Sequence, residues 1–254
     1  MNTAMRDSTK QMLNKVPEVT LFFWVIKIMA TTVGETAADF LNTDLNFGLT
    51  GTSIFMDALL LIALVFQLRT RRDVPSIYWV TVVLLSVFGT LATDNRVDNF
   101  GVAMQIITII FSGALMATFA AWYASERTLS IHSIFTTRRE LFYWAAILFT
   151  FALGTAAGDL VAEGMKLGYG TSAFAFGAII GVVAFAHYLF KLNAVLAFWV
   201  AYILTQYCSV MVNCKLVADD WNSAVAGPCI EGCSRLAPVW AISGHDKHRV
   251  SCAA

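Results

Sequence analysis

The chain has 254 residues, of which 58% are hydrophobic and 13% are charged, and its mean hydropathy is +0.67. This composition excludes an ordinary soluble domain and indicates that lipid is the solvent for most of the chain. The net charge is zero and no basic patch is present, which excludes a nucleic-acid-binding protein.

Seven apolar stretches are long enough to cross a hydrocarbon core, which takes about 20 residues of helix. The stretches contain Gly and Ala and lack the alternation that is typical of strands in a membrane barrel. The sequence therefore predicts an all-α polytopic transmembrane bundle of about seven spans, with strands nearly absent. The expected spans lie near residues 19–41, 51–68, 76–94, 101–123, 141–162, 170–190 and 194–213.

Basic residues are sorted between alternate loops. Ten of them lie in residues 1–18, in the loops 69–75 and 124–140, or at Lys191, whereas the loops of opposite parity hold only two. By the positive-inside rule, this bias predicts a multi-pass protein of the cell (inner) membrane with a cytoplasmic N-terminus. Residues 1–18 are expected to be a cytoplasmic lead-in without a cleavable signal, because the first apolar run is itself long enough to span.

An internal repeat organises the chain. In three copies a Gly follows the Trp after ten residues and an Asp follows the Gly after five, which indicates duplication. The Trp residues that open the copies, each after another aromatic residue, are Trp24, Trp79, Trp144 and Trp199. The Gly residues are Gly34, Gly89 and Gly154, and the Asp residues are Asp39, Asp94 and Asp159.

Each repeat unit contains two spans. The sequence GTSIFMD after the first motif helix has a counterpart in GTSAFAFG at 170–177, so the second span is repeated as well. We expect the fourth copy to be truncated, because Ser209 and Cys214 fill its Gly and Asp positions. The predicted units are repeat 1 at 19–75, repeat 2 at 76–139, repeat 3 at 140–192, a truncated repeat 4 at 193–213 and an atypical tail at 214–254.

The chain changes character after Thr205, and all five cysteines follow that residue. One interpretation is a tail in which Cys229, Cys233, His245 and His248 ligate a metal ion, although their spacing fits zinc patterns only loosely. The other interpretation is a tail foreign to the repeat architecture, such as the product of a reading-frame change. Either way, we expect the chain beyond Thr205 to be poorly packed and dispensable.

With these motifs, residues 16–205 resemble a family of bacterial membrane proteins built from four tandem repeats of unknown function. Each repeat of that family has two membrane regions and a characteristic Trp. The resemblance implies an architecture and a bacterial source, and it implies no activity or cofactor. The fourth copy departs from that pattern, because Ser209 and Cys214 stand at its Gly and Asp positions.

Four residues on the first span are spaced by four and so share one helical face: Lys27, Thr31, Glu35 and Asp39. Because charges are costly in lipid, this stripe is expected to face the bundle interior. Lys27, and Asp57 two turns into the second span, are candidates for an ion pair or for coupling. The alternative for Lys27 is a purely structural ion pair.

The three motif helices place oxygen atoms at equivalent positions near one end. Glu35, Thr90 and Thr155 each stand four residues before the motif Asp, on the same helical face. Oxygen ligands suit a hard cation or a proton, so these residues and the three Asp residues predict a shared polar site. The predicted function is a transporter or binder of such a cation, and the alternative is a membrane scaffold or sensor without turnover. An intramembrane enzyme is least supported, because no nucleophile and base recur together.

Overall fold

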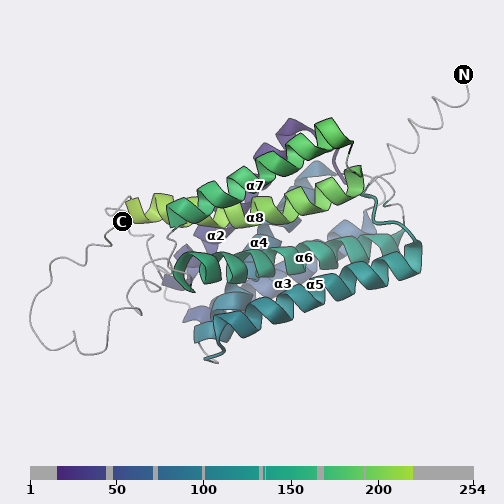
Figure 1. Cartoon of the computed structure of the whole chain (residues 1–254). Helices are drawn as coiled ribbons and strands as arrows, with labels where there is room; N and C mark the ends of the chain where they lie inside the picture. The colour runs from purple at the N-terminus through teal and green to yellow at the C-terminus, as the bar shows by residue number, and fades with distance from the viewer. Residues whose placement is uncertain are drawn as a thin grey trace, which may run out of the picture.

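The computed structural model describes residues 16–43, 48–70, 74–98, 101–131, 134, 136–164, 169–191 and 193–219, without side chains for some of them, including 39, 40 and 211–219. Within these residues the chain forms seven long helices and no strand (Figure 1). They are α2 Leu21–Thr43, α3 Gly48–Arg69, α4 Pro75–Asp98, α5 Met104–Glu126, α6 Thr137–Asp159, α7 Tyr169–Phe190 and α8 Ala194–Asp219. A short π-helical turn, η2 Leu160–Gly164, extends α6.

The helices confirm the predicted class of a helical membrane bundle. Six of them, α2 to α7, are long and apolar enough to cross a membrane, and α8 contributes a shorter apolar stretch, Ala194–Val210. Each predicted span coincides with one helix. The chain is therefore a multi-pass membrane protein, and the hydrocarbon core favours helices because they satisfy their backbone hydrogen bonds internally.

Local sequence signals explain several helix ends. Thr136 caps α6, since its hydroxyl accepts a hydrogen bond from the Arg139 backbone N–H at 3.4 Å. At the other end of the preceding loop, Arg127 ends α5 in the left-handed conformation with φ of 56°, and its N–H bonds to the Tyr123 carbonyl at 2.9 Å. The loop between these helices is further fixed by the ion pair of Arg139 with Glu126 at 2.6 Å.

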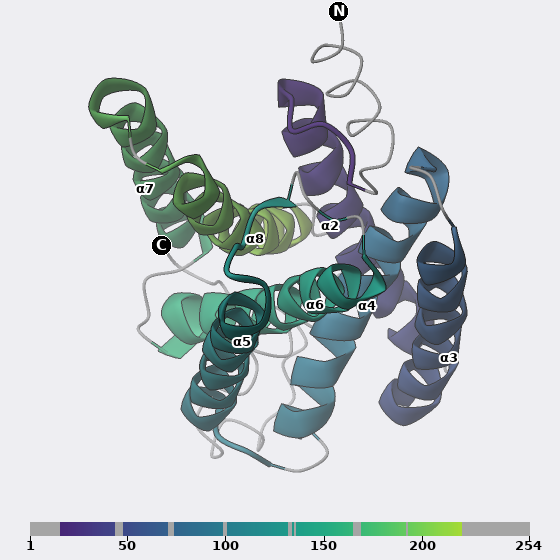
Figure 2. The ribbon, with the colours of Figure 1, turned by 90° about the vertical axis from the view of Figure 1, so that its right-hand side faces the viewer.

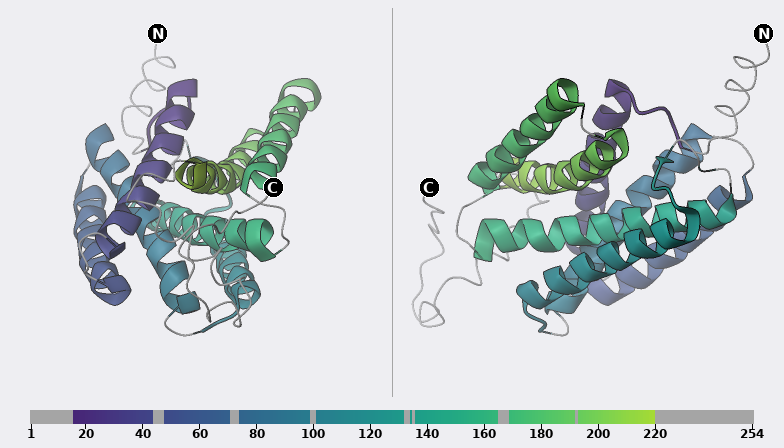
Figure 3. Two further views of the ribbon diagram at one scale, coloured as in Figure 1. Left: turned by 90° about the vertical axis from the view of Figure 1, so that its left-hand side faces the viewer. Right: turned by 45° about the vertical axis from the view of Figure 1, so that its right-hand side comes forward.

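The first helices of successive repeats form a closed inner ring. In this ring α2 packs on α4, α4 on α6, α6 on α8, and α8 returns to α2. The remaining helices lie outside the ring, and Figures 2 and 3 show α3, α5 and α7 at its periphery. Each outer helix packs mainly on the first helix of the following repeat: α3 on α4, α5 on α6 and α7 on α8.

Burial follows this division between inner and outer helices. Within its candidate span, α6 has 61% of its residues buried, whereas α7 has 6%. The inner helix α2 is an intermediate case at 39%, because no outer helix of a preceding repeat covers it among the described residues. The exposed side chains of the outer helices are mostly large and apolar, as a lipid-facing surface requires.

The aromatic pairs that open the four repeats interlock around one end of the ring, here called the aromatic end. The first aromatic residue of each copy contacts the Trp of the next copy, and the fourth copy returns to the first. The ring-centroid distances are 5.4 Å for Phe23–Trp79, 5.4 Å for Tyr78–Trp144, 6.2 Å for Tyr143–Trp199 and 5.8 Å for Phe198–Trp24. The four inner helices therefore all begin at the aromatic end and run away from it, crossing one another at an angle (Figures 2 and 3).

The motif glycines bring neighbouring inner helices close together. A Cβ on Gly89 would lie 2.9 Å from the backbone N of Ala152, and a Cβ on Gly34 would lie 2.6 Å from the Cβ of Ser86. Gly154 approaches Gln206 in the same way, so each Gly faces the following inner helix. Small residues permit this approach of helices in a membrane, where packing rather than hydrophobicity drives association.

The expectation that the chain is poorly packed beyond Thr205 is wrong for the residues that follow it directly. Helix α8 continues to Asp219, and Gln206, Ser209 and Val210 are buried. The reason is that α8 completes the inner ring, so its side chains pack against α2 and α6. Residues 220–254, with the proposed metal ligands Cys229, Cys233, His245 and His248, lie outside the described residues.

Candidate functional site

A column of polar side chains runs along the inside of the helix ring from α2. Lys27 and Thr31 are fully buried, and Glu35 is 5% exposed. Their spacing of four residues keeps them on one face of α2, and the ring of inner helices encloses that face. A fully buried Lys such as Lys27 is rare in a membrane span, because a charge there is costly unless it is paired or functional.

The Lys27 ammonium is held by the last inner helix. It donates a hydrogen bond to Gln206 Oε1 at 3.1 Å and another to the Tyr202 carbonyl at 3.4 Å. It also lies over the Tyr202 ring, 4.8 Å from its centroid, and 5.9 Å from the centroid of the Phe151 ring. Both contacts are of the cation–π type, which gains strength where water is excluded.

Thr31 and Ser86 continue the polar column one turn further. The Thr31 hydroxyl donates to the Lys27 carbonyl at 2.9 Å and lies 3.3 Å from Gln206 Oε1. The Ser86 hydroxyl donates to the Thr31 carbonyl at 3.1 Å and so joins α4 to α2. Gln206 Oε1 thus lies within hydrogen-bond distance of two residues of α2, and the three helices α2, α4 and α8 share one hydrogen-bond network.

Glu35 occupies the next turn and interacts electrostatically with Lys27. Thr90 on α4 and Thr155 on α6 stand at the equivalent position of their repeats, and both are buried. The Thr155 hydroxyl donates to the Phe151 carbonyl at 3.5 Å, whereas the Thr90 hydroxyl has no hydrogen-bond partner among the described residues. On α8 the equivalent position holds an apolar residue, Val210, so the fourth copy supplies no oxygen there.

The motif aspartates are less enclosed than Glu35. Asp94 and Asp159 are half-buried at the end of the ring opposite the aromatic rings, and the side chain of Asp39 lies outside the described residues. No group of three His, Cys, Asp or Glu side chains that could hold a metal ion occurs in the described part of the chain. The two described aspartates therefore flank the column rather than form a compact carboxylate cluster with Glu35.

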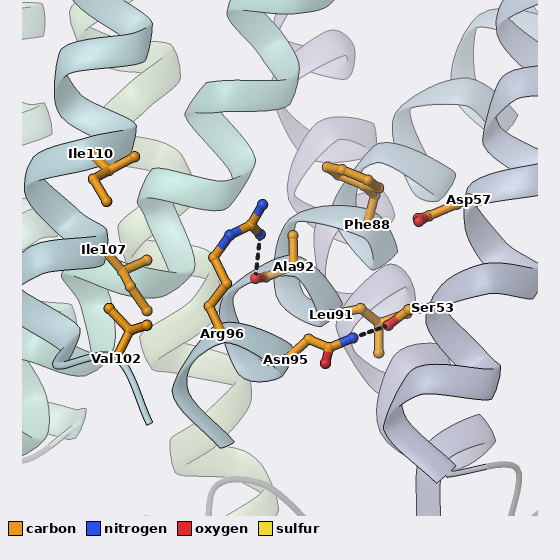
Figure 4. A pocket seen from close by; sticks show the side chains of 10 residues that line it. All are labelled: Ser53, Asp57, Phe88, Leu91, Ala92, Asn95, Arg96, Val102, Ile107 and Ile110. Carbon is orange, nitrogen blue, oxygen red and sulfur yellow. Dashed lines mark hydrogen bonds between the residues drawn. The ribbon is translucent and has the colours of Figure 1, made fainter. Parts of the chain in front are cut away.

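Asp57 lies away from this column. It lines a pocket of about 600 Å³ between α3, α4 and α5, together with Ser53, Asn95 and Arg96 and several apolar side chains (Figure 4). The Asn95 amide donates to the Ser53 hydroxyl at 3.2 Å, and the Arg96 guanidinium donates to the Ala92 carbonyl at 2.7 Å. The ion-pair candidates Lys27 and Asp57 thus belong to two separate environments.

Three buried phenols lie on the other side of Lys27, toward the aromatic end. The hydroxyls of Tyr78 and Tyr143 are 2.6 Å apart, and either can be the donor. Tyr202 is close enough to both to interact electrostatically. Sequence reasoning missed the phenols and also Gln206. Their signal was the repeat register, since Tyr202 stands at the position of Lys27 and Gln206 at that of Thr31.

The arrangement joins acid, base and neutral oxygen groups inside a low-dielectric ring. Such a set can hold a positive charge, since carboxylate, hydroxyl and amide oxygens are hard donors. It can also transfer protons, since carboxyl, amine and phenol groups all gain and lose them. Ionisable groups inside a membrane bundle are a hypothesis for a functional site by default.

The repeats of the chain match a known family. The model of a repeat of unknown function, DUF347, matches residues 22–73, 77–128 and 142–193. The chain belongs to this repeat family. The three matches are tandem and each contains one inner and one outer helix, so one DUF347 repeat corresponds to a two-helix unit of the fold. No curated protein and no solved structure matches the chain.

The geometry explains what the DUF347 repeat specifies. Its aromatic pair interlocks with the next copy at one end of the ring, and its Gly permits close packing of the following inner helix. In contrast, Lys27 and Glu35 occur in the first copy. Val82 and Ile147 stand at the position of Lys27 in the second and third copies. The ionisable residues of the column are therefore not part of the structural pattern of the repeat. The packing of the inner helices does not require them.

Proposed function

We propose that this chain binds and conducts a small hard cation or a proton along the axis of its helix ring. The observation that carries the proposal is the enclosure of Lys27 and Glu35 on one face of α2, inside a ring of otherwise mostly apolar helices. Two buried charges stabilise a fold less well than apolar side chains of similar volume. Stability alone therefore does not explain why Lys27 and Glu35 are both buried in the ring.

The direction of the inner helices supports a cationic ligand. Because α2, α4, α6 and α8 all begin at the aromatic end, the negative poles of four helix dipoles lie toward the opposite end, which carries Asp94 and Asp159. The half-buried aspartates add to this negative field. A cation or a proton that approaches this end is attracted toward Glu35, where Thr90 and Thr155 supply further oxygen atoms at the same depth.

We assign the aromatic end to the cytoplasmic side of the cell (inner) membrane. The described residues that flank the basic loops 69–75 and 124–140 lie at this end, as does the start of α2, and basic loops are retained in the cytoplasm. The carboxylate end then faces the outside. In this orientation, the column is entered from the outer side and the interlocked aromatic rings stand between Lys27 and the cytoplasm.

The test is flux measurement in liposomes that contain the purified full-length chain. Proton flux is followed with an enclosed pH-sensitive dye, and Mn²⁺ and Mg²⁺ uptake is followed with enclosed metal indicators. Glu35→Gln is expected to lower the active flux strongly, because it removes the charge and keeps the shape. Asp57→Asn is the matched control, because it removes a carboxylate of a neighbouring membrane helix that lies outside the column.

The second candidate is a membrane scaffold or sensor without turnover. The observation that favours it is the aromatic end, where eight interlocked aromatic side chains of the four repeats close the ring. If the wild-type protein conducts neither protons nor divalent cations under a membrane potential, the transport proposal is wrong and the scaffold becomes the better interpretation. Binding of a cation without flux would point to a sensor.

A further inference from the structure

The three buried phenols are not used by the site proposed above. Tyr78, Tyr143 and Tyr202 are fully buried. Tyr202 lies between Lys27 and the aromatic end, to which Tyr78 and Tyr143 belong. The Tyr202 hydroxyl forms no hydrogen bond with any described residue, although it is close to Tyr78 and Tyr143. A buried hydroxyl without a partner is costly, so its presence calls for a reason other than packing.

The repeat itself provides an internal comparison for the phenol oxygens. At the position of Tyr78 and Tyr143, the first and fourth copies have Phe23 and Phe198, which make the same interlocking ring contacts. The aromatic packing therefore needs only the ring. The hydroxyls occur in two adjacent copies, and there they meet at 2.6 Å.

The phenols extend the polar column in the direction of the aromatic end. Side chains of a helix point toward its N-terminus, so Tyr202 reaches from the level of Lys27 down to the aromatic rings. Its ring lies 5.6 Å from that of Phe198 and 6.1 Å from that of Trp199, while the Lys27 ammonium sits 4.8 Å from its centroid. Glu35, Lys27 and the phenols thus form one sequence of ionisable groups along the ring.

The chemistry of these groups discriminates between a metal cation and a proton. A metal cation that leaves Glu35 toward the aromatic end meets the Lys27 ammonium, and like charges repel strongly where the dielectric constant is low. A proton is not blocked, because the amine itself carries it. A phenol accepts a proton on its oxygen and donates its own, so Tyr78 and Tyr143 can pass a proton across their hydrogen bond, and Tyr202 delivers one when its hydroxyl turns toward them.

We propose that the species conducted by the column is the proton and that Tyr202, Tyr78 and Tyr143 carry it from Lys27 through the aromatic end. The cycle starts from the Lys27 ammonium and the Glu35 carboxylate. The ammonium releases one proton to the Tyr202 oxygen, the Tyr202 hydroxyl proton passes to Tyr78 and Tyr143, and the last phenol releases its own hydroxyl proton at the aromatic end. A proton from the outer side then binds Glu35 and passes to the neutral Lys27 amine, which restores the ammonium and the carboxylate. This inference rests on the proposed function and narrows its ligand.

The experiment compares proton flux and Mn²⁺ flux in liposomes for the full-length wild type and for Tyr143→Phe and Tyr202→Phe. Each variant keeps the ring and removes one oxygen, so the fold is retained, and the midpoint of thermal unfolding checks this. Loss of one relay hydroxyl is expected to lower the proton flux by about tenfold or more. Tyr123→Phe is the matched control, because Tyr123 is an exposed residue of α5 outside the ring and its variant is expected to conduct as the wild type does.

The outcomes separate this inference from the proposed function. Proton flux that falls in both relay variants and persists in Tyr123→Phe supports the phenol path. Unchanged proton flux in both folded relay variants overturns it. Wild-type flux of Mn²⁺ without proton flux also overturns it, but leaves cation conduction by the ring intact. No flux of either kind overturns the proposed function and this inference together.

Discussion

The Lys27 ammonium donates a hydrogen bond to Gln206 Oε1 at 3.1 Å, which joins two residues that lie 179 positions apart. This contact connects the first inner helix to the last and lies at the level where Ser86 also joins α4 to α2. The network therefore closes the ring in the membrane interior, as the aromatic pairs close it at one end. Lys27 thus joins the two ends of the repeat array, together with Thr31 and the aromatic contact of Trp24 with Phe198.

Lys27→Met is expected to destabilise the protein by about 3–5 kcal/mol, because it removes the counter-charge of Glu35 while the carboxylate stays buried. The measurement is the free energy of unfolding, obtained by titrating the micelle-bound protein with dodecyl sulfate. The double variant Lys27→Met/Glu35→Gln is expected to regain most of the lost stability, because it buries neither charge. Strictly additive effects of the two changes would show that Lys27 and Glu35 are not coupled.

Gly89→Ala is expected to destabilise the ring by about 1–3 kcal/mol, the usual cost of overpacking a tight contact. The added methyl group would meet backbone atoms of α6 at 2.9 Å, and backbone atoms cannot turn aside as a side chain can. The control is Gly113→Ala on α5, where no atom lies within 4 Å of the new Cβ. This control is expected to gain up to about 1 kcal/mol, because Ala is a better helix former than Gly. Thermal unfolding in detergent measures both, and equal midpoints would contradict the close-packing role.

Reporter fusions are expected to place the loops 69–75 and 124–140 in the cytoplasm. The reason is the concentration of Arg in these loops, which opposes their translocation. A fluorescent protein joined within either loop should fluoresce, and alkaline phosphatase at the same positions should stay inactive. Active phosphatase at either position would reverse the orientation assigned to the aromatic end.

The sequence was sufficient to predict the spans because each property involved is local. An apolar run of membrane length is visible in one segment, and a spacing of four places Lys27, Thr31 and Glu35 on one face of a helix whatever the neighbours are. The repeat also revealed that the motif helices run in the same direction. These features need no knowledge of which helices touch.

The partners of Lys27 could not be predicted, because they depend on which helices close the ring. Gln206 follows a point where the repeat pattern fades, so sequence reasoning placed it at the start of a dispensable tail. The Tyr78–Tyr143 contact was hidden for a similar reason, since aromatic residues near span ends are common as interface anchors. Aligning the four copies by their Trp residues places Tyr202 with Lys27 and Gln206 with Thr31, which is the one sequence signal for both.

The last prediction concerns where the chain can be shortened. Truncation after Asp219 is expected to leave the free energy of unfolding unchanged, because α8 ends there and all described contacts of the ring are retained. Truncation after Thr205 removes Gln206, which binds both Lys27 and Thr31, and also removes the buried Ser209 and Val210. It is expected to cost at least about 3 kcal/mol, because the Lys27 ammonium loses its side-chain acceptor while it remains buried. The yield of monodisperse protein in detergent and its thermal midpoint distinguish the two variants. Equal stability of both would show that the ring does not depend on α8 beyond Thr205, whereas loss of folded protein in the longer variant would assign a structural role to residues 220–254.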